Sequence, residues 1–110
     1  MSLRNIPNLL VFRPGDALET FYCFKSIMKN ASNPSAILLT RQKLPKLNID
    51  NKIVEEGVNK GAYILNKEDN PDAVLYATGS EVHLALDVCR SINKKIQIIN
   101  IPAWELLEKQ

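Results

Sequence analysis

The sequence has few of the residues on which common metal and catalytic sites depend. It contains one histidine, His83, and two cysteines, Cys23 and Cys89, among 110 residues. A zinc site built from Cys and His needs four ligands, so these residues are too few. Each cysteine lies in an apolar helical pattern, far from the other in the chain. This predicts two reduced core cysteines, and neither a disulfide nor a metal site.

The sequence also lacks concentrated charge and long apolar runs. The formal net charge is only +2, and the basic residues are scattered, with Lys94 and Lys95 as the only adjacent pair. Proteins that bind nucleic acids gather Lys and Arg on one face, so we expect no nucleic-acid partner. No segment approaches the ~20 apolar residues of a membrane span, and the N-terminus has no signal-peptide core. We therefore expect no membrane contact and a cytoplasmic location.

The remaining composition is that of a folded protein. Hydrophobic residues make up 45% and charged residues 24% of the chain, which argues against disorder. A length of 110 residues corresponds to one small domain or to parts of two.

The first forty residues follow a strand–helix–strand pattern. A short apolar run at 8–12 predicts a buried strand. Asp16 then caps a helix that runs to about Lys29, and Glu19 completes a capping box with it. A second buried strand is predicted at 36–39. This is a βαβ unit, which implies parallel strands and a right-handed crossover.

Residues 44–60 lose this pattern and are interpreted as an interdomain linker, with a helical turn around 53–58. The pattern then returns, and Thr78 with Glu81 is a candidate capping box. The elements predicted for this half are strands at 62–65, 73–77 and 96–101, a helix with apolar positions from 82 to 92, and a helical turn at 104–107.

The predicted fold class is therefore α/β, with two partial βαβ units of mainly parallel strands joined by a linker. Because the linker lacks apolar periodicity, we expect two packing clusters with few contacts between them. We also expect that strands 8–12 and 96–101 do not pair in one sheet. The first cluster should hold Leu10, Phe21, Ile37 and Leu38, and the second Val74, Leu86 and Ile99.

Ligands in open α/β sheets collect at the carboxyl ends of the strands. That rule selects Arg13, Arg41 with Gln42, and 78–80. A guanidinium directly after a strand suits a phosphate or carboxylate, although a surface or interface salt bridge is the alternative for Arg41. Residues 78–80 match neither common phosphate-loop pattern, and a helix cap is the simpler interpretation. His83 is expected to be exposed or interfacial. Taken together, these residues indicate one plausible anion contact and no catalytic mechanism.

Six strings of the sequence resemble transketolase motifs, in the family's order and over essentially the whole chain. The strings are Leu3-Arg4-Asn5-Ile6-Pro7-Asn8, Phe12-Arg13-Pro14-Gly15-Asp16-Ala17, Leu39-Thr40-Arg41-Gln42-Lys43-Leu44-Pro45, Lys60-Gly61-Ala62-Tyr63, Ala77-Thr78-Gly79-Ser80-Glu81-Val82 and Pro102-Ala103-Trp104-Glu105-Leu106.

The resemblance implies a thiamine-diphosphate enzyme of the pentose phosphate pathway, which moves a two-carbon ketol unit from a ketose phosphate to an aldose phosphate. Residues 1–43 would be the end of the pyrimidine-binding domain, 44–60 would be the interdomain linker, and 61–110 would be the start of the C-terminal domain. It also implies that Arg41 grips the substrate phosphate, with Thr40 and Lys43 departing from the family's Ser and Asn. The full-length family enzymes are homodimers that bind thiamine diphosphate with a divalent cation such as magnesium.

The family's Gly-Asp-Gly cofactor motif is absent from this sequence. We therefore expect no catalytic, cofactor-binding or metal-binding residue on this chain, and no activity from the chain alone. One alternative is a non-catalytic α/β module that binds a sugar phosphate or a partner subunit. Another is a different thiamine-dependent enzyme, such as a deoxyxylulose-phosphate synthase or a dihydroxyacetone synthase.

Overall fold

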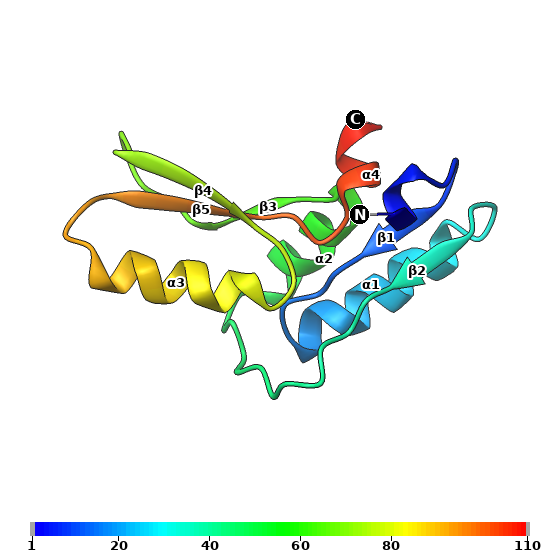
Figure 1. The fold of residues 1–110 in the computed structure, drawn as a ribbon, viewed down its shortest axis with the longest axis horizontal. Helices are drawn as coiled ribbons and strands as arrows, with labels where there is room; N and C mark the ends of the chain where they lie inside the picture. Colours follow the sequence, from blue (N-terminus) through cyan, green and yellow to red (C-terminus); the bar gives the residue numbers. More distant parts are fainter. Residues whose placement is uncertain (1, 110) are drawn as a thin grey trace.

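A computed structural model describes residues 2–109 of the chain as an α/β fold (Figure 1), which confirms the predicted fold class. A 3-10 turn at Ser2–Asn5 precedes the regular elements. The strands are β1 (Leu10–Phe12), β2 (Ser35–Ile37), β3 (Tyr63–Asn66), β4 (Ala73–Ala77) and β5 (Ile96–Asn100), and the helices are α1 (Ala17–Lys29), α2 (Asn51–Lys60), α3 (Glu81–Ser91) and α4 (Trp104–Glu108).

The strands form two separate sheets. In the first, β1 and β2 pair in parallel across α1, with Val11 opposite Ala36. In the second, the order is β3-β5-β4, and β4 and β5 pair in parallel across α3. Both predicted βαβ units are thus confirmed, and β1 and β5 do not share a sheet. The antiparallel pairing of β3 with β5 was not predicted, because its sequence carries no direction signal.

Helix α2 occupies most of the stretch that the sequence analysis assigns to a linker. Its ten residues form a complete helix that Asp50 caps by accepting a hydrogen bond from the Lys52 N–H. Val54 and Val58, one helical turn apart, are its buried apolar side chains. The three apolar residues of this stretch, Ile53, Val54 and Val58, span little more than one turn, so only a single turn was predicted here.

The first core cluster draws on both halves of the chain, so the expectation of few contacts between them is wrong. Helices α2 and α4 close over β1 and α1, because the small β1–β2 sheet cannot bury its apolar residues alone. The buried members of this cluster are Leu10, Phe12, Cys23, Val54, Val58, Tyr63, Ala103 and Leu106.

The second cluster lies between α3 and the three-stranded sheet. Its buried members come from the second half of the chain: Ala77, Val82, Ala85, Ile96 and Ile98. Leu47, from the segment between β2 and α2, packs against it. Figure 1 shows α3 on one side of this sheet and no helix on the other.

Several residues take the places predicted for them. Leu10 is buried in the first cluster, Ile37 packs against that cluster, and Leu86 packs against the second. The two cysteines are free, with Cys23 buried and Cys89 half-buried.

Four core predictions are wrong. Phe21, Leu38 and Val74 are exposed, by 61%, 42% and 39%. Ile99 is only half-buried, and its neighbour Ile98 takes the core position instead. In β4 and β5 the cause is the single helical layer, because alternate side chains face the uncovered side of the sheet.

Gly61 ends α2 in the left-handed region, with φ of 92°. A Cβ there would lie 2.4 Å from the Ala103 carbonyl oxygen and 2.5 Å from the Leu107 nitrogen. Gly79 is also left-handed, at φ of 60°, but a Cβ there would approach no atom closer than 3.4 Å. We expect Gly61→Ala to lower the free energy of unfolding by about 1–3 kcal/mol more than Gly79→Ala, because α4 must move. Urea unfolding of both variants tests this, and equal losses would contradict it.

Candidate functional site

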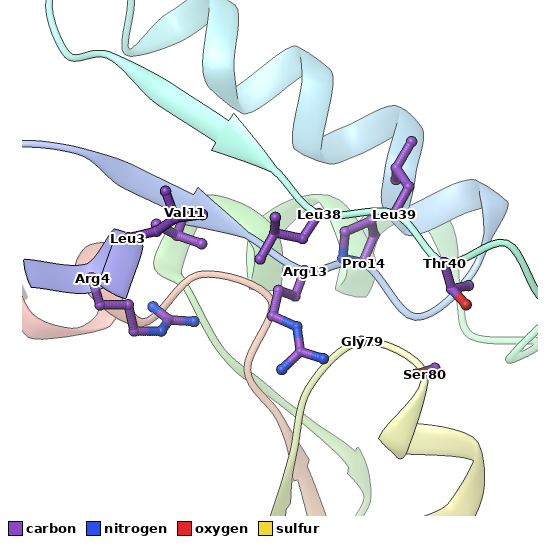
Figure 2. Close-up of a pocket in the computed structure, with 10 residues that line it drawn as sticks. All are labelled: Leu3, Arg4, Val11, Arg13, Pro14, Leu38, Leu39, Thr40, Gly79 and Ser80. Atoms are coloured by element: carbon purple, nitrogen blue, oxygen red, sulfur yellow. The ribbon is translucent and has the colours of Figure 1, made fainter. Parts of the chain in front are cut away.

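A pocket of about 410 Å³ lies where the carboxyl ends of β1 and β2 meet the turn between β4 and α3 (Figure 2). The structure brings Arg13, Gly79 and Ser80, three of the residues that the strand-end rule selects, together beside Thr40. The lining residues are Leu3, Arg4, Val11, Arg13, Pro14, Leu38, Leu39, Thr40, Gly79 and Ser80.

Both arginines of this pocket already have carboxylate partners. Arg13 Nη2 lies 3.0 Å from Glu81 Oε2, and Arg4 Nη1 forms an ion pair with Glu105 Oε1. Glu105 also accepts a hydrogen bond from the Val11 N–H through its other oxygen, at 3.2 Å. These carboxylates offset the positive charge of the pocket, so the arginines mainly join the two halves of the chain.

The turn before α3 does not form the candidate capping box. Ser80 is the N-cap residue and makes no side-chain cap hydrogen bond. Glu81 binds Arg13 instead of reaching back to Thr78. The Gly79 N–H donates to the Arg13 carbonyl at 3.0 Å, which fixes the turn against the end of β1. The turn therefore acts as an interface between the halves.

Arg41 lies in the irregular segment that follows β2 and is exposed. A second pocket, of about 360 Å³, opens beside the start of α1 and shares Pro14, Leu39 and Thr40 with the first. Gln42 lines this second pocket, and its N–H donates to Thr40 Oγ1 at 3.2 Å. Arg41 itself lines neither pocket, but it stands between two residues that do.

A buried polar cluster links α1, β3 and β5. Glu19 is fully buried, and its Oε1 accepts hydrogen bonds from Tyr63 Oη at 3.0 Å and Asn100 Nδ2 at 2.6 Å. Its Oε2 accepts from the Gly15 N–H. Burial raises the pKa of Glu19 to about 7, although these donors pull it down. Burial also raises the pKa of Tyr63 well above its ordinary range.

From the sequence, only a capping role is predicted for Glu19, and no role is predicted for Tyr63 or Asn100. Part of that role is confirmed, because the Glu19 N–H donates to Asp16 Oδ1 at 2.8 Å. The return bond goes to Gly15 instead of Asp16. A signal for the cluster was present in β5, where Ile96, Ile98 and Asn100 share the inward face. A polar residue at an inward strand position needs a buried partner.

His83 joins α3 to the start of α1. Its Nε2 lies 2.7 Å from the Gly15 carbonyl oxygen. Because a carbonyl only accepts, Nε2 must carry the proton of this hydrogen bond. The prediction of an exposed or interfacial histidine is thus confirmed as interfacial, and the ring has a structural partner.

Within 2–109, no three His, Cys, Asp or Glu side chains lie close enough together to bind a metal ion. Across the same residues, every helix is too short or too polar to cross a membrane.

Two family models match consecutive parts of the chain. Residues 1–46 match the model described as "Transketolase, pyrimidine binding domain". Residues 61–110 match "Transketolase-like TK C-terminal domain". The two matches flank the segment that contains α2.

Individual transketolases match nearly the whole chain. The transketolase of Staphylococcus aureus strain MW2 is 39% identical over 98% of this chain and 17% of its own length. That of Aquifex aeolicus is 42% identical over 99% of this chain and 16% of its own length.

Solved transketolase structures also match nearly the whole chain. A mutant transketolase of Pichia stipitis in complex with fructose-6-phosphate superposes with a TM-score of 0.88 at 36% identity, covering 99% of this chain and 16% of that one. The Campylobacter jejuni transketolase gives 0.85 at 36% identity, covering 99% and 17%. The chain thus belongs to the transketolase family and corresponds to about one sixth of such an enzyme.

Proposed function

We propose that this chain is a working part of an enzyme that uses thiamine diphosphate to transfer a two-carbon ketol unit from a ketose phosphate to an aldose phosphate, in the pentose phosphate pathway. The match of residues 1–46 and 61–110 to two consecutive transketolase domains carries this proposal. In this proposal, residues 1–43 are the end of the pyrimidine-binding domain, 44–60 connect the two domains, and 61–110 are the start of the C-terminal domain.

Arg41 is proposed to bind the phosphate of the substrate. It follows β2 at the carboxyl edge of the sheet, where ligands of α/β folds collect. Its side chain is exposed, between residues that line two pockets. A guanidinium there offers a fork of donors that fits phosphate oxygens. The Pichia stipitis transketolases solved with fructose-6-phosphate and sedoheptulose-7-phosphate support a sugar phosphate as the substrate class.

The proposal places the thiamine diphosphate and magnesium site outside these 110 residues, and includes a homodimer and a cytoplasmic location. The first point rests on the family's Gly-Asp-Gly cofactor motif, which this sequence does not contain. Two free cysteines fit a reducing compartment.

A chimera tests the function. Residues 1–110 would replace the matching stretch of the Staphylococcus aureus transketolase, and ketol transfer from fructose 6-phosphate would be measured with thiamine diphosphate and magnesium. We expect turnover from the chimera and none from the isolated chain, since enzymatic acceleration requires ~8 kcal/mol or more that one phosphate anchor cannot supply. A Gly/Ser stretch of equal length in the same place is the inactive control.

A folded chimera that binds cofactor but transfers no ketol unit would contradict the proposal. Turnover by the isolated chain would contradict it too. The first outcome would favour a non-catalytic module that binds a sugar phosphate or a partner subunit.

A further inference from the structure

The segment that carries Arg41 has no helix or strand of its own between β2 and α2 (Figure 1). At its start, the Leu38 N–H donates to the Phe12 carbonyl at 2.8 Å. Toward its end, the Leu47 N–H donates to Asp16 Oδ2 at 3.0 Å. The segment is therefore tethered on either side of Arg41, once by backbone and once by a side chain.

The side-chain tether comes from a rigid group. Asp16 is only 8% exposed, and its other oxygen, Oδ1, caps α1 by accepting from the Glu19 N–H at 2.8 Å. The residue before it, Gly15, is held by Glu19 on its N–H and by His83 on its carbonyl. One carboxylate thus joins the start of a helix to the irregular segment, with a different oxygen for each.

We propose that Asp16 is a positioning residue for substrate phosphate, which fixes the segment that carries Arg41 in the arrangement that binds. This rests on the proposed role of Arg41. Without the tether the segment samples other arrangements, and apparent affinity falls in proportion to the fraction that remains competent. Asp16 itself need not touch the substrate.

Asp16→Asn separates the two hydrogen bonds of the carboxylate, one to the Glu19 N–H and one to the Leu47 N–H. Asparagine caps helices about as well as aspartate, so the cap of α1 is retained. Its amide nitrogen then faces the Leu47 N–H, and two donors cannot bond. Asp50→Asn is the matched control, because Asp50 caps α2 with the same bond type at the end of the same segment.

The first measurement is hydrogen exchange of the Leu47 amide in the 110-residue chain. We expect protection in the unaltered chain and in Asp50→Asn, and exchange at least tenfold faster in Asp16→Asn, with the amide of Glu19 still protected. Unchanged protection of Leu47 in Asp16→Asn would overturn the proposal, whatever Arg41 does.

The second measurement is made in the chimera, with fructose 6-phosphate or fructose as donor and an unphosphorylated aldehyde as acceptor. We expect Asp16→Asn to raise the KM for fructose 6-phosphate on the order of tenfold, and that for fructose little. In an Arg41→Ala background it should add nothing, because both residues act on one contact. An equal effect in that background would overturn the proposal. If instead the proposed role of Arg41 is wrong, the Arg41→Ala single variant will leave the preference for fructose 6-phosphate over fructose unchanged.

Discussion

Replacing Arg41 with alanine is expected to raise the KM for fructose 6-phosphate by roughly ten- to a hundredfold in the chimera. The phosphate is remote from the reacting carbon and is bound in both the ground state and the transition state. Losing its anchor should therefore weaken binding before it slows chemistry. Some loss in kcat follows if the anchor also orients the substrate.

The comparison with fructose identifies the contact, since the two sugars differ only in the phosphate. Arg41→Lys should fall between the unaltered chimera and Arg41→Ala, because it keeps the charge but loses the fork of donors. Lys43→Ala is the matched control, an exposed cation in the same segment. Equal losses with fructose and fructose 6-phosphate would mean that Arg41 is structural.

The free energy of unfolding should fall by about 3 kcal/mol as pH rises from about 4.5 to about 7, through Glu19 alone. Burial raises the pKa of this carboxyl from 4.5 to about 7 in the folded chain. Between those values the unfolded chain releases the proton and the folded chain keeps it. The contribution is thus fully present below about pH 4.5 and is lost by about pH 7.

Chemical unfolding of the 110-residue chain across this range measures the effect. The quantity to follow is the difference between the unaltered chain and Glu19→Gln, in which other titrating groups cancel. That difference should change steadily with pH, because glutamine cannot ionise. Glu56→Gln, on the exposed side of α2, is the control and should leave the pH profile unchanged. A pH-independent difference for Glu19→Gln would show that folding does not raise the pKa of Glu19.

Local patterns predicted the parts of the fold that depend on neighbours in sequence. The apolar runs at β1, β4 and β5 and the cap at Asp16 each need only a few consecutive residues. The strand-end rule selected Arg13 and Gly79, which follow strands of two different sheets, and the structure brings both residues to one pocket.

The other parts of the fold depend on how elements that are far apart in the sequence pack against one another. Nothing in 51–60 shows that Val54 and Val58 will lie against α1 and α4, because burial is decided by segments elsewhere in the chain. Similarly, the role of Glu19 depends on Tyr63 and Asn100, which come from two other strands. A local pattern could show its helix cap but not its partners.

The joint core has a consequence for how the protein is made. Leu10 and Phe12 share their buried cluster with Ala103 and Leu106, which lie near the other end of this chain. A ribosome that adds 5–20 residues per second needs on the order of 5–20 s to pass between these points. For that time β1 lacks the part of its cover that α4 provides, and a chaperone or another nascent chain can bind to this apolar surface. Synthesis speed through the second half therefore sets how long the first half is at risk of aggregation.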